Sequence, residues 1–579
     1  MILHRIEPLD LHAHLFRVVL RVAEPGQVVR LALPVWIPGS YLVREFARHL
    51  HGLEARQGQT RREVRQLDKA TWEVACGGRA PLEVEYRVYA FDTSVRAAYL
   101  DARRGFFNGT SVFFRVEGRE AEAQQVELRG LPKGWKVATA LSPVKVDARG
   151  QGRYEAADYD ELVDHPVELG DFWRGEFRAG GVLHEFVVAG ALPGFDGERL
   201  LADARRICEA QIAFWHGRRR PPFERYVFLL NAMDDAYGGL EHRASTALVC
   251  ARRDLPRRDE EGPTDGYVTL LGLVSHEYFH TWNVKRLRPA EFTRYDYSRE
   301  NYTELLWFFE GFTSYYDDLF LVRAGLIDEA RYLKLLAKTV NQVLATPGRQ
   351  VQSVAEASFD AWVKYYRQDE NTVNATVSYY TKGSLVALAL DLTLRRDGHT
   401  LDEVMKALWQ STGGGPIGEA DIAQALQQVG GRSYAKELRR WVHGTQDLPL
   451  DELLAECGVQ WQGHAPAWAL RLGMRTQDGG GAVQVKAVMR GGAAERAGLA
   501  AGDEILAVNE WRLRKLDDLA LYAREGDSCE LLVSRDSQIL RLRLAVPRAD
   551  AARQVQLTLD PRGSAAQQAR RRAWLGSAR

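Results

Sequence analysis

The chain has 579 residues, which is too long for a single hydrophobic core and indicates three or four domains. Hydrophobic residues make up 46% of it and charged residues 27%, a globular composition that excludes a mainly disordered protein. Lysine plus arginine equals aspartate plus glutamate, at 77 residues each. This balance gives no electrostatic reason to expect nucleic acid or an anionic membrane as the main partner.

The cysteines and the first residues bear on the cellular compartment. "MILHRIEPLDLHAHLFRVVL" has acidic and histidine residues where a signal peptide needs an unbroken apolar segment, and no run of 18 apolar residues follows. We therefore expect a cytoplasmic protein that does not enter the membrane. The cysteines are scattered, without the close pairs of zinc ribbons or redox motifs, and are expected to be reduced core residues: Cys76, Cys208, Cys250, Cys457 and Cys529.

Residues 1–168 are predicted to form an N-terminal β-sandwich. Every second residue from Leu82 to Val88 in "PLEVEYRVYAF" is apolar, which is the period of a half-buried strand. In "FFNGTSVFF" the dipeptide Asn108-Gly109 stands between apolar runs and predicts a hairpin turn, because both turn positions tolerate positive φ.

Residues 169–463 are predicted to be mainly helical. Apolar residues recur at intervals of three and four in "LIDEARYLKLLAKTVNQVL" and in "KGSLVALALDLTLRR". Pro466 in "GHAPAW" marks a linker, and residues 464–548 are predicted to form a compact β-rich unit. The tail, residues 549–579, is expected to form one short surface helix that ends at Gly576.

The helical region contains "HEYFHTWNVKRLRP", an H-E-x-x-H motif. On a helix, His276 and His280 lie one turn apart on the same side, so both imidazoles can reach one ion at about 2.0–2.1 Å. Glu277 lies about 100° around the helix, where it can take a proton from a water at the metal.

The alternative is an ordinary core helix in which the motif arises by chance. With 14 histidines in 579 residues, we estimate about a 2% chance of such a match. The preceding "YVTLLGLVS" is apolar and would bury the helix, which makes two unpartnered histidines and a carboxylate costly there. A bound metal removes that cost.

A catalytic zinc site of this type needs a third protein ligand, and two glutamates compete for that role. Glu310 is embedded among apolar residues in "LLWFFEGFTSYY", where an ionised carboxylate is tolerable mainly beside a metal or a charged partner. Glu304 follows Asn301 by three residues, the spacing of a capping box at a helix start. We therefore favour Glu310 as the ligand.

"HEYFHTWNVKRLRP" followed by "WFFEGFTSYY" resembles the glycyl aminopeptidase family of zinc metallopeptidases, metallopeptidase family sixty-one, which is related to the gluzincin aminopeptidases. The resemblance extends over nearly the whole chain, including "VWIPGSYLVREF" near its start. It implies a thermolysin-like catalytic domain in a multidomain α+β protein, with Glu310 as third zinc ligand. The chain departs in spacing: 29 residues separate His280 from Glu310, and an inserted loop, "RLRPAEFTRYDYSREN", would account for this.

"YGGLEHRAS" resembles the G-x-M-E-N segment with which related aminopeptidases hold their substrate. Gly238 and Gly239 would let the main chain lie close to a peptide, and Glu241 could pair with the substrate's free ammonium group. The chain has His242 where the wider clan has asparagine. Without the resemblance, this segment would be interpreted as a turn with an exposed acid.

"SYYTKGSLVAL" resembles the Y-E-K-G segment whose tyrosine stabilises the oxyanion in related enzymes. The resemblance assigns this role to Tyr380. A phenol suits it because its reference pKa of about 10 keeps it protonated at neutral pH. Tyr379 is the alternative, and one of the two is expected to face the core.

"GGAAERAGLAAGDEILAVNEWRL", residues 491–513, resembles part of a PDZ domain, in which a peptide adds a strand to a sheet edge. The resemblance implies that the Φ-G-Φ loop receiving the peptide's terminal carboxylate is Leu472, Gly473 and Met474, and that "LDDLALYAR" flanks the groove. Glu510 replaces a glycine that many relatives have. The alternative is that this domain only packs on the peptidase.

Together these motifs predict a zinc aminopeptidase in which Glu277 activates the water and Tyr380 stabilises the oxyanion. A preference for N-terminal glycine or alanine is implied by the family alone. The expected partners are peptides with a free N-terminus and, at the PDZ domain, a peptide C-terminus; no nucleic acid or membrane is expected. A zinc endopeptidase and a non-catalytic, PDZ-mediated peptide-binding protein remain alternatives, and the oligomeric state stays open.

Overall fold

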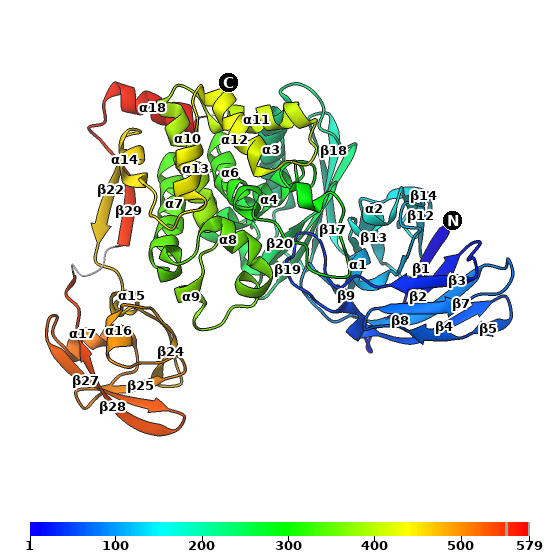
Figure 1. Ribbon diagram of the computed structural model, residues 1–579, viewed down its shortest axis with the longest axis horizontal. Coiled ribbons are helices and arrows are strands. Elements are labelled where there is room, and N and C mark those ends of the chain that lie inside the picture. The colour runs from blue at the N-terminus through cyan, green and yellow to red at the C-terminus, as the bar shows by residue number, and fades with distance from the viewer. Residues whose placement is uncertain (550–553, 577–579) are drawn as a thin grey trace. The chain divides into compact units, whose positions relative to one another are not determined.

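The computed structural model describes residues 1–549 and 554–576 of the chain (Figure 1). The chain divides into two compact units. The first comprises Met1–Tyr302 with Trp409–Ile417, and the second Thr303–Leu408 with Gly418–Arg579.

The first unit begins with the predicted N-terminal β-domain, whose largest sheet is drawn in blue and cyan in Figure 1. Alternate residues of β8 are buried, as the sequence pattern predicts, and their side chains join the core. In order across it, the eight strands are β14 (Ser142–Val146), β15 (Gly152–Ala156), β12 (Gln124–Leu128), β1 (Ile2–Asp10), β2 (Leu15–Val22), β8 (Leu82–Tyr89), β4 (Leu50–Gln57) and β5 (Thr60–Arg62).

Two four-stranded sheets complete this domain. The short helices α1 (Gly109–Val112) and α2 (Tyr159–Val163) connect strands within it. One sheet has the order β13 (Lys136–Thr139), β16 (Val167–Gly170), β10 (Arg104–Phe107), β9 (Ala98–Leu100); the other has the order β11 (Arg115–Val116), β3 (Val28–Ala32), β7 (Thr71–Ala75), β6 (Val64–Gln66).

The hairpin predicted at Asn108-Gly109 is wrong. Asn108 has extended backbone, and α1 follows it. The Asn108 amide is buried and donates a hydrogen bond to the Val95 carbonyl at 2.7 Å. A Cβ on Gly109 would lie 3.0 Å from the Val163 Cα, so this glycine serves a close approach to α2 instead of a turn.

A five-stranded mixed sheet and two long helices complete the first unit. The helices are α3 (Gly197–His216) and α4 (Asp265–Phe279), and the Thr264 hydroxyl caps α4 by accepting from the Tyr267 N–H at 3.1 Å. The sequence pattern missed this sheet because buried parallel strands form continuous apolar runs without alternation. Its order is β17 (Trp173–Ala179), β18 (Val182–Ala189), β19 (Arg225–Met233), β21 (Ser245–Ala251), β20 (Tyr237–Glu241).

The second unit contains most of the helices. Both segments with helical periodicity form helices, α7 and α10, which confirms that prediction. The helices of residues 303–455 are α5 (Leu306–Phe309), α6 (Gly311–Arg323), α7 (Glu329–Leu344), α8 (Val354–Phe359), α9 (Thr372–Ala375), α10 (Thr381–Arg396), α11 (Leu401–Thr412), α12 (Glu419–Gly430), α13 (Ala435–Trp441) and α14 (Leu450–Ala455).

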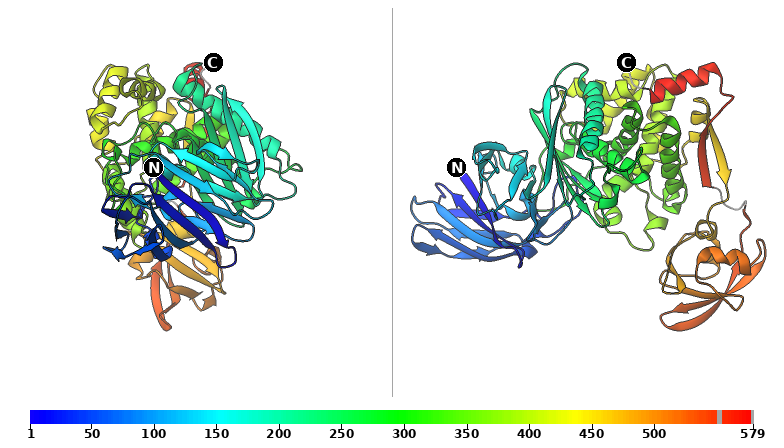
Figure 2. Two further views of the ribbon diagram at one scale, coloured as in Figure 1. Left: turned by 90° about the vertical axis from the view of Figure 1, so that its right-hand side faces the viewer. Right: turned by 180° about the vertical axis from the view of Figure 1, so that it is seen from behind.

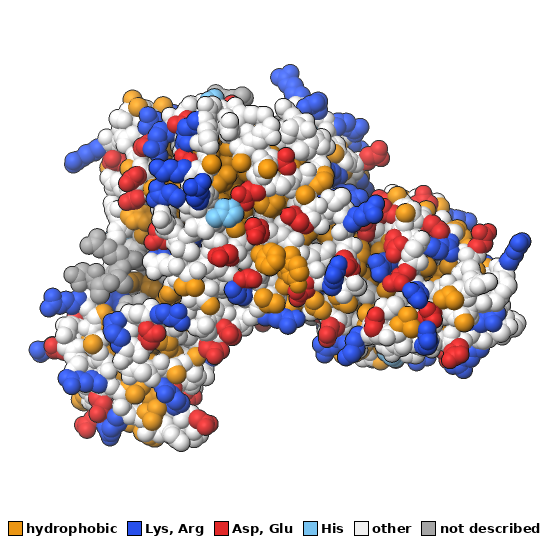
Figure 3. Space-filling view, viewed as in Figure 1, with side chains coloured by type: hydrophobic (Ala, Val, Ile, Leu, Met, Phe, Trp, Pro, Cys, Tyr) orange, Lys and Arg blue, Asp and Glu red, His pale blue; other side chains and the backbone are white. Residues whose placement is uncertain are grey.

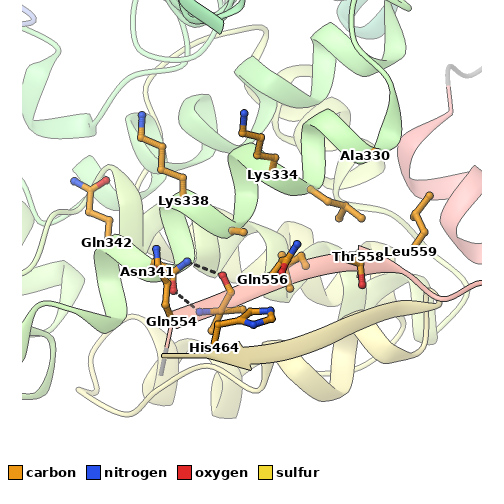
Figure 4. Close-up of a pocket in the computed structure, with 14 residues that line it drawn as sticks. Ala330, Lys334, Lys338, Asn341, Gln342, His464, Gln554, Gln556, Thr558 and Leu559 are labelled. Carbon is orange, nitrogen blue, oxygen red and sulfur yellow. Dashed lines mark hydrogen bonds between the residues drawn. The ribbon is translucent and has the colours of Figure 1, made fainter. Parts of the chain in front are cut away.

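The tail holds the predicted helix, α18 (Ala565–Leu575), which ends at Gly576, and also a strand that the sequence did not reveal. This strand, β29 (Gln554–Leu559), pairs with β22 (Val459–His464) in a two-stranded ribbon visible in Figure 2, right. The ribbon and α7 line a groove (Figure 4). At its end, the Asn341 amide of α7 exchanges two hydrogen bonds of 2.7 Å with the Val555 backbone.

The C-terminal domain has the PDZ-like β architecture that was expected. Its sheet follows the order β23-β24-β25-β27-β28, with β26 paired to β25. The core beneath it includes Leu472 and Met474. The elements are α15 (Trp468–Leu472), β23 (Met474–Gly479), β24 (Ala482–Val488), α16 (Ala493–Arg496), β25 (Glu504–Val508), β26 (Trp511–Arg512), α17 (Leu519–Tyr522), β27 (Ser528–Arg535) and β28 (Gln538–Ala545).

Three observations test the expectations from composition. All five cysteines are free, as predicted; four are buried core residues, whereas Cys76 is only partly buried. Within residues 1–549 and 554–576, no helix combines the length and apolar character needed to cross a bilayer. On the face shown in Figure 3, basic and acidic side chains are interspersed.

Candidate metal centre and substrate cleft

The two histidines of the H-E-x-x-H motif meet at the C-terminal end of α4. His276 Nε2 and His280 Nε2 lie 3.1 Å apart. His280 Nδ1 lies 2.8 Å from the Asn283 carbonyl oxygen, which can only accept, so Nδ1 carries the proton and Nε2 keeps its lone pair toward His276. This is the tautomer that a metal-ligating histidine needs.

Glu277 projects from α4 onto β20, the edge strand of the mixed sheet. A Cβ on Gly239 would lie 2.1 Å from Glu277 Oε1, so only glycine leaves room for this carboxylate against the strand. Gly238 precedes Gly239 on β20. The Arg96 guanidinium donates a hydrogen bond to the Gly239 carbonyl at 3.2 Å. "YGGLE" is therefore not a turn but an edge strand beside a buried acid.

Glu241 ends β20 and is 5% exposed, so it is not the exposed acid of the alternative interpretation. Glu241, Glu277 and His280 each offer one ligand atom, and these three atoms lie within 4.8 Å of one another. Both carboxylates of the predicted site thus gather at the end of the edge strand, close to a histidine. This arrangement is attractive to a cation or an ammonium group.

A buried ion pair lies behind this strand end. Lys285 Nζ is 2.6 Å from Asp164 Oδ1, and the two side chains are 6% and 10% exposed. Asp164 also accepts hydrogen bonds from His242 Nδ1 at 3.2 Å and from the Arg243 backbone N–H at 3.0 Å. Through Asp164, these contacts connect His242 and Arg243, which follow Glu241, to Lys285 in the loop after α4.

The pair is charged at neutral pH. Burial alone would raise the pKa of Asp164, but the Lys285 ammonium, with the His242 contact, holds this pKa well below its usual 3.8. Burial would lower the pKa of Lys285, yet the Asp164 carboxylate raises it above its usual 10.5. Burial lowers the pKa of His242, which keeps this histidine neutral.

Replacing Asp164 by asparagine should lower the free energy of unfolding at neutral pH by about 3 kcal/mol, because Lys285 would stay buried without its carboxylate. The folded-state pKa of Asp164 is depressed, so its contribution is present above the unfolded value near 3.8 and is lost as the pH falls through the lower folded value. The difference in stability between wild type and variant should therefore be constant from about pH 8 to pH 5 and shrink below about pH 4.

Urea unfolding across this pH range measures both effects. Combining Asp164→Asn with Lys285→Met should recover part of the loss, because no unpaired buried charge remains. Equal stability of wild type and Asp164→Asn at neutral pH would contradict the role of this ion pair.

In the second unit, Glu310 stands at the junction of α5 and α6. Its side chain is 2% exposed, and its backbone continues the helical hydrogen bonds from Leu306 to Ser314. The neighbouring glycine brings α6 against α10: a Cβ on Gly311 would lie 2.6 Å from the Gly383 Cα. The glycines of "FEGF" and "YTKG" thus let two helix backbones touch, close to Glu310 and Tyr380.

The two candidate tyrosines differ in environment. Tyr379 is fully buried, whereas Tyr380, the N-cap of α10, is half-buried, and their rings stack at 4.7 Å. Burial and then the Glu310 charge raise the pKa of Tyr380 well above 10. Tyr380 therefore remains a hydrogen-bond donor throughout the neutral range.

The capping box predicted from Asn301 and Glu304 is wrong. Leu305 is the N-cap of α5 and makes no side-chain cap bond. The Asn301 amide is engaged instead with the Asp296 backbone, accepting from its N–H at 2.9 Å and donating to its carbonyl at 2.8 Å. Glu304 is exposed, as expected of a residue that is not a ligand.

His276 and His280 lie in the first unit and Glu310 lies in the second, and each offers one ligand atom. Two imidazoles and one carboxylate are the donor types of catalytic zinc sites. The His280 tautomer fits such a metal as well. The described residues are therefore compatible with zinc.

At the predicted PDZ loop, Gly473 adopts φ +74° and caps α15, donating its N–H to the Leu470 carbonyl at 3.1 Å. Leu472 and Met474 are buried on either side of it. The segment expected to flank the groove forms only the short α17 and the 3-10 turn before it. Peptide binding at this loop stays a prediction.

Sequence reasoning missed Asp164 and Lys285. Lys285 lies inside the quoted motif, and a lysine in an otherwise buried segment was a possible signal. Asp164 gave no such signal, because its partner, Lys285, lies far along the chain.

Comparison with known proteins agrees with this architecture. Family models match for the M61 glycyl aminopeptidase over residues 269–386, for the Peptidase M61 N-terminal domain over residues 4–171 and for a PDZ domain over residues 484–535. The solved structure of an aminopeptidase N family protein from Idiomarina loihiensis is 37% identical, and the alignment covers 99% of this chain and 100% of that chain with a TM-score of 0.93.

An M1 zinc metallopeptidase from Deinococcus radiodurans is 16% identical, with 78% of this chain and 94% of that chain covered and a TM-score of 0.47. No curated protein matches the chain significantly.

Proposed function

We propose that this chain, which belongs to the M61 glycyl aminopeptidase family, is a zinc aminopeptidase that removes the first residue of a peptide with the help of Glu277. The observation that carries the proposal is the pair of imidazole nitrogens 3.1 Å apart beside a glycine-cradled carboxylate. A hydrogen bond between two histidines would explain the short distance but not the acid held next to them.

We assign zinc binding to His276, His280 and Glu310, whose donor types support this choice. When bound, zinc would act as a Lewis acid that lowers the pKa of a coordinated water. Asn283 is a positioning residue in this scheme, because its carbonyl fixes the His280 tautomer.

The chain's own residues then perform the proton transfers. Glu277 takes a proton from the attacking water and returns it to the departing amine. Tyr380 donates its phenolic hydrogen bond to the oxyanion that develops on the scissile carbonyl. Gly238 and Gly239 on the edge strand leave space for the peptide main chain to lie alongside.

Glu241 decides where the peptide is cut. We propose that its carboxylate pairs with the substrate's α-ammonium group, which places the first peptide bond at Glu277. The closeness of Glu241, Glu277 and His280 supports this, because little more than one residue fits between the anchor and the reacting group. The family description supports glycine as that residue.

The purified zinc-loaded protein should remove the first residue from a short peptide that begins with glycine and should leave the N-acetylated peptide intact. Acetylation removes the positive charge that Glu241 is proposed to bind. Mass spectrometry of the products measures this directly. Internal cleavage of both peptides would identify an endopeptidase, and cleavage of neither would favour a PDZ-mediated binding protein.

Replacing glycine by alanine, valine and leucine at the first position of the same peptide tests residue preference. We expect kcat/KM to fall in that order.

A further inference from the structure

A tight turn of the N-terminal β-domain reaches the proposed substrate anchor. The Ser40 N–H donates to the Ile37 carbonyl at 3.0 Å, and Gly39 has φ +90°. Proline followed by a glycine with positive φ is the signature of a type II turn. The turn belongs to "VWIPGSYLVREF", a motif for which the catalytic scheme above has no use.

Gly39 touches the carboxylate of Glu241. A Cβ on Gly39 would lie 2.5 Å from both Glu241 oxygens and 2.7 Å from Cδ, so the turn approaches the oxygen end of the side chain. Glu277 and His280 have ligand atoms within 4.8 Å of Glu241. The Glu241 carboxylate is therefore close both to the turn and to the reacting groups.

The turn is held rigidly in this position. The buried Ser40 hydroxyl accepts from the Arg44 guanidinium at 2.8 Å. Just before the turn, the Val35 N–H donates to the Tyr297 carbonyl at 2.8 Å, and the Trp36 indole donates to the Asp296 carbonyl at 2.8 Å. Such a network makes the turn a fixed wall and not a mobile flap.

Pro38 also contributes to this wall. Together with Ile37 it lines a small cavity with Asp164, His242 and Lys285, the buried polar group behind Glu241. The turn and the ion pair thus line one cavity next to the end of β20, where His242 follows Glu241.

We propose that the Gly39 turn is the closed end of the substrate cleft and a specificity determinant. The missing Cβ leaves room for the Glu241 carboxylate against the turn, while the turn backbone blocks any residue before the first one. This inference rests on the proposed role of Glu241 as the amine anchor. It adds that the N-terminal β-domain, through one glycine, limits the enzyme to removing single residues.

Replacing Gly39 by alanine should raise KM for a glycine-initiated peptide at least about tenfold, because the new methyl group must displace the Glu241 carboxylate. The change in kcat should be smaller, since Glu277 is untouched. Gly52→Ala is the matched control: Gly52 lies in the same domain and has φ +65°, and a Cβ added to it would have nothing within 4 Å. Both variants carry the backbone strain of alanine at positive φ, and only Gly39→Ala meets Glu241.

Equal KM values for the two variants would overturn the proposal. If Gly39→Ala does not fold, the proposal can be tested on the wild-type enzyme with two substrates, a glycyl peptide and its sarcosyl analogue. The N-methyl group of sarcosine adds bulk to the substrate's ammonium group but keeps its positive charge. A closed end predicts kcat/KM at least about tenfold lower for the sarcosyl peptide. Equal kcat/KM values for the two peptides would exclude the Gly39 turn as the closed end of the cleft.

A different result is expected if Glu241 does not bind the substrate's ammonium group at all. In that case the wild-type enzyme would cleave the N-acetylated glycyl peptide as well as the free one, whatever the effect of Gly39→Ala.

Discussion

Replacing Glu277 by glutamine should lower kcat for a glycine-initiated peptide by about a thousandfold, because glutamine cannot take a proton from the attacking water. Glutamine has nearly the same shape, so it still fits against Gly239, where a Cβ would lie 2.1 Å from Glu277 Oε1. Zinc content should be unchanged, since the proposed ligands are His276, His280 and Glu310. Steady-state kinetics with elemental analysis of the purified variant measures both quantities.

Glu304→Gln is the matched control for this experiment. It removes an exposed glutamate near Glu310 in sequence and should leave kcat within about twofold of wild type, as surface substitutions usually do. If Glu277→Gln kept more than about a tenth of the wild-type turnover, Glu277 would not be the general base.

Replacing Tyr380 by phenylalanine should lower kcat by about a hundredfold with little change in KM, because the lost hydrogen bond forms only as the oxyanion develops. The pKa of Tyr380 is raised well above 10 by burial and by the charge of Glu310. The wild-type pH profile should accordingly show no loss of activity from ionisation of this phenol up to about pH 9.

Tyr379→Phe provides the comparison, because the two rings stack at 4.7 Å and Tyr379 is fully buried. Its kcat should stay within about threefold of wild type. If kcat fell strongly in Tyr379→Phe but only slightly in Tyr380→Phe, Tyr379 would be the residue that stabilises the oxyanion.

Residues close together in the chain were the predictable part of the site. His276, Glu277 and His280 occupy one helix turn, so helical geometry alone relates their side chains. Secondary structure followed the same rule, since α7 and α10 have strong apolar periodicity and formed as predicted. The failures at Asn108 and Asn301 have a common cause: each amide bonds to backbone that a local turn or cap rule does not consider.

The sequence by itself determined the chemistry of this protein: an H-E-x-x-H helix, a buried glutamate downstream, a glycine-rich acidic segment and a PDZ-like module. These depend on residue types and short spacings, which are fixed by covalent geometry and helix period. Only the tertiary structure decided that "YGGLE" is an edge strand beneath Glu277, that Lys285 is paired with Asp164 and that Gly39 covers Glu241. Those contacts join segments far apart in the chain, where packing and the exclusion of water select the partners and no local pattern records them.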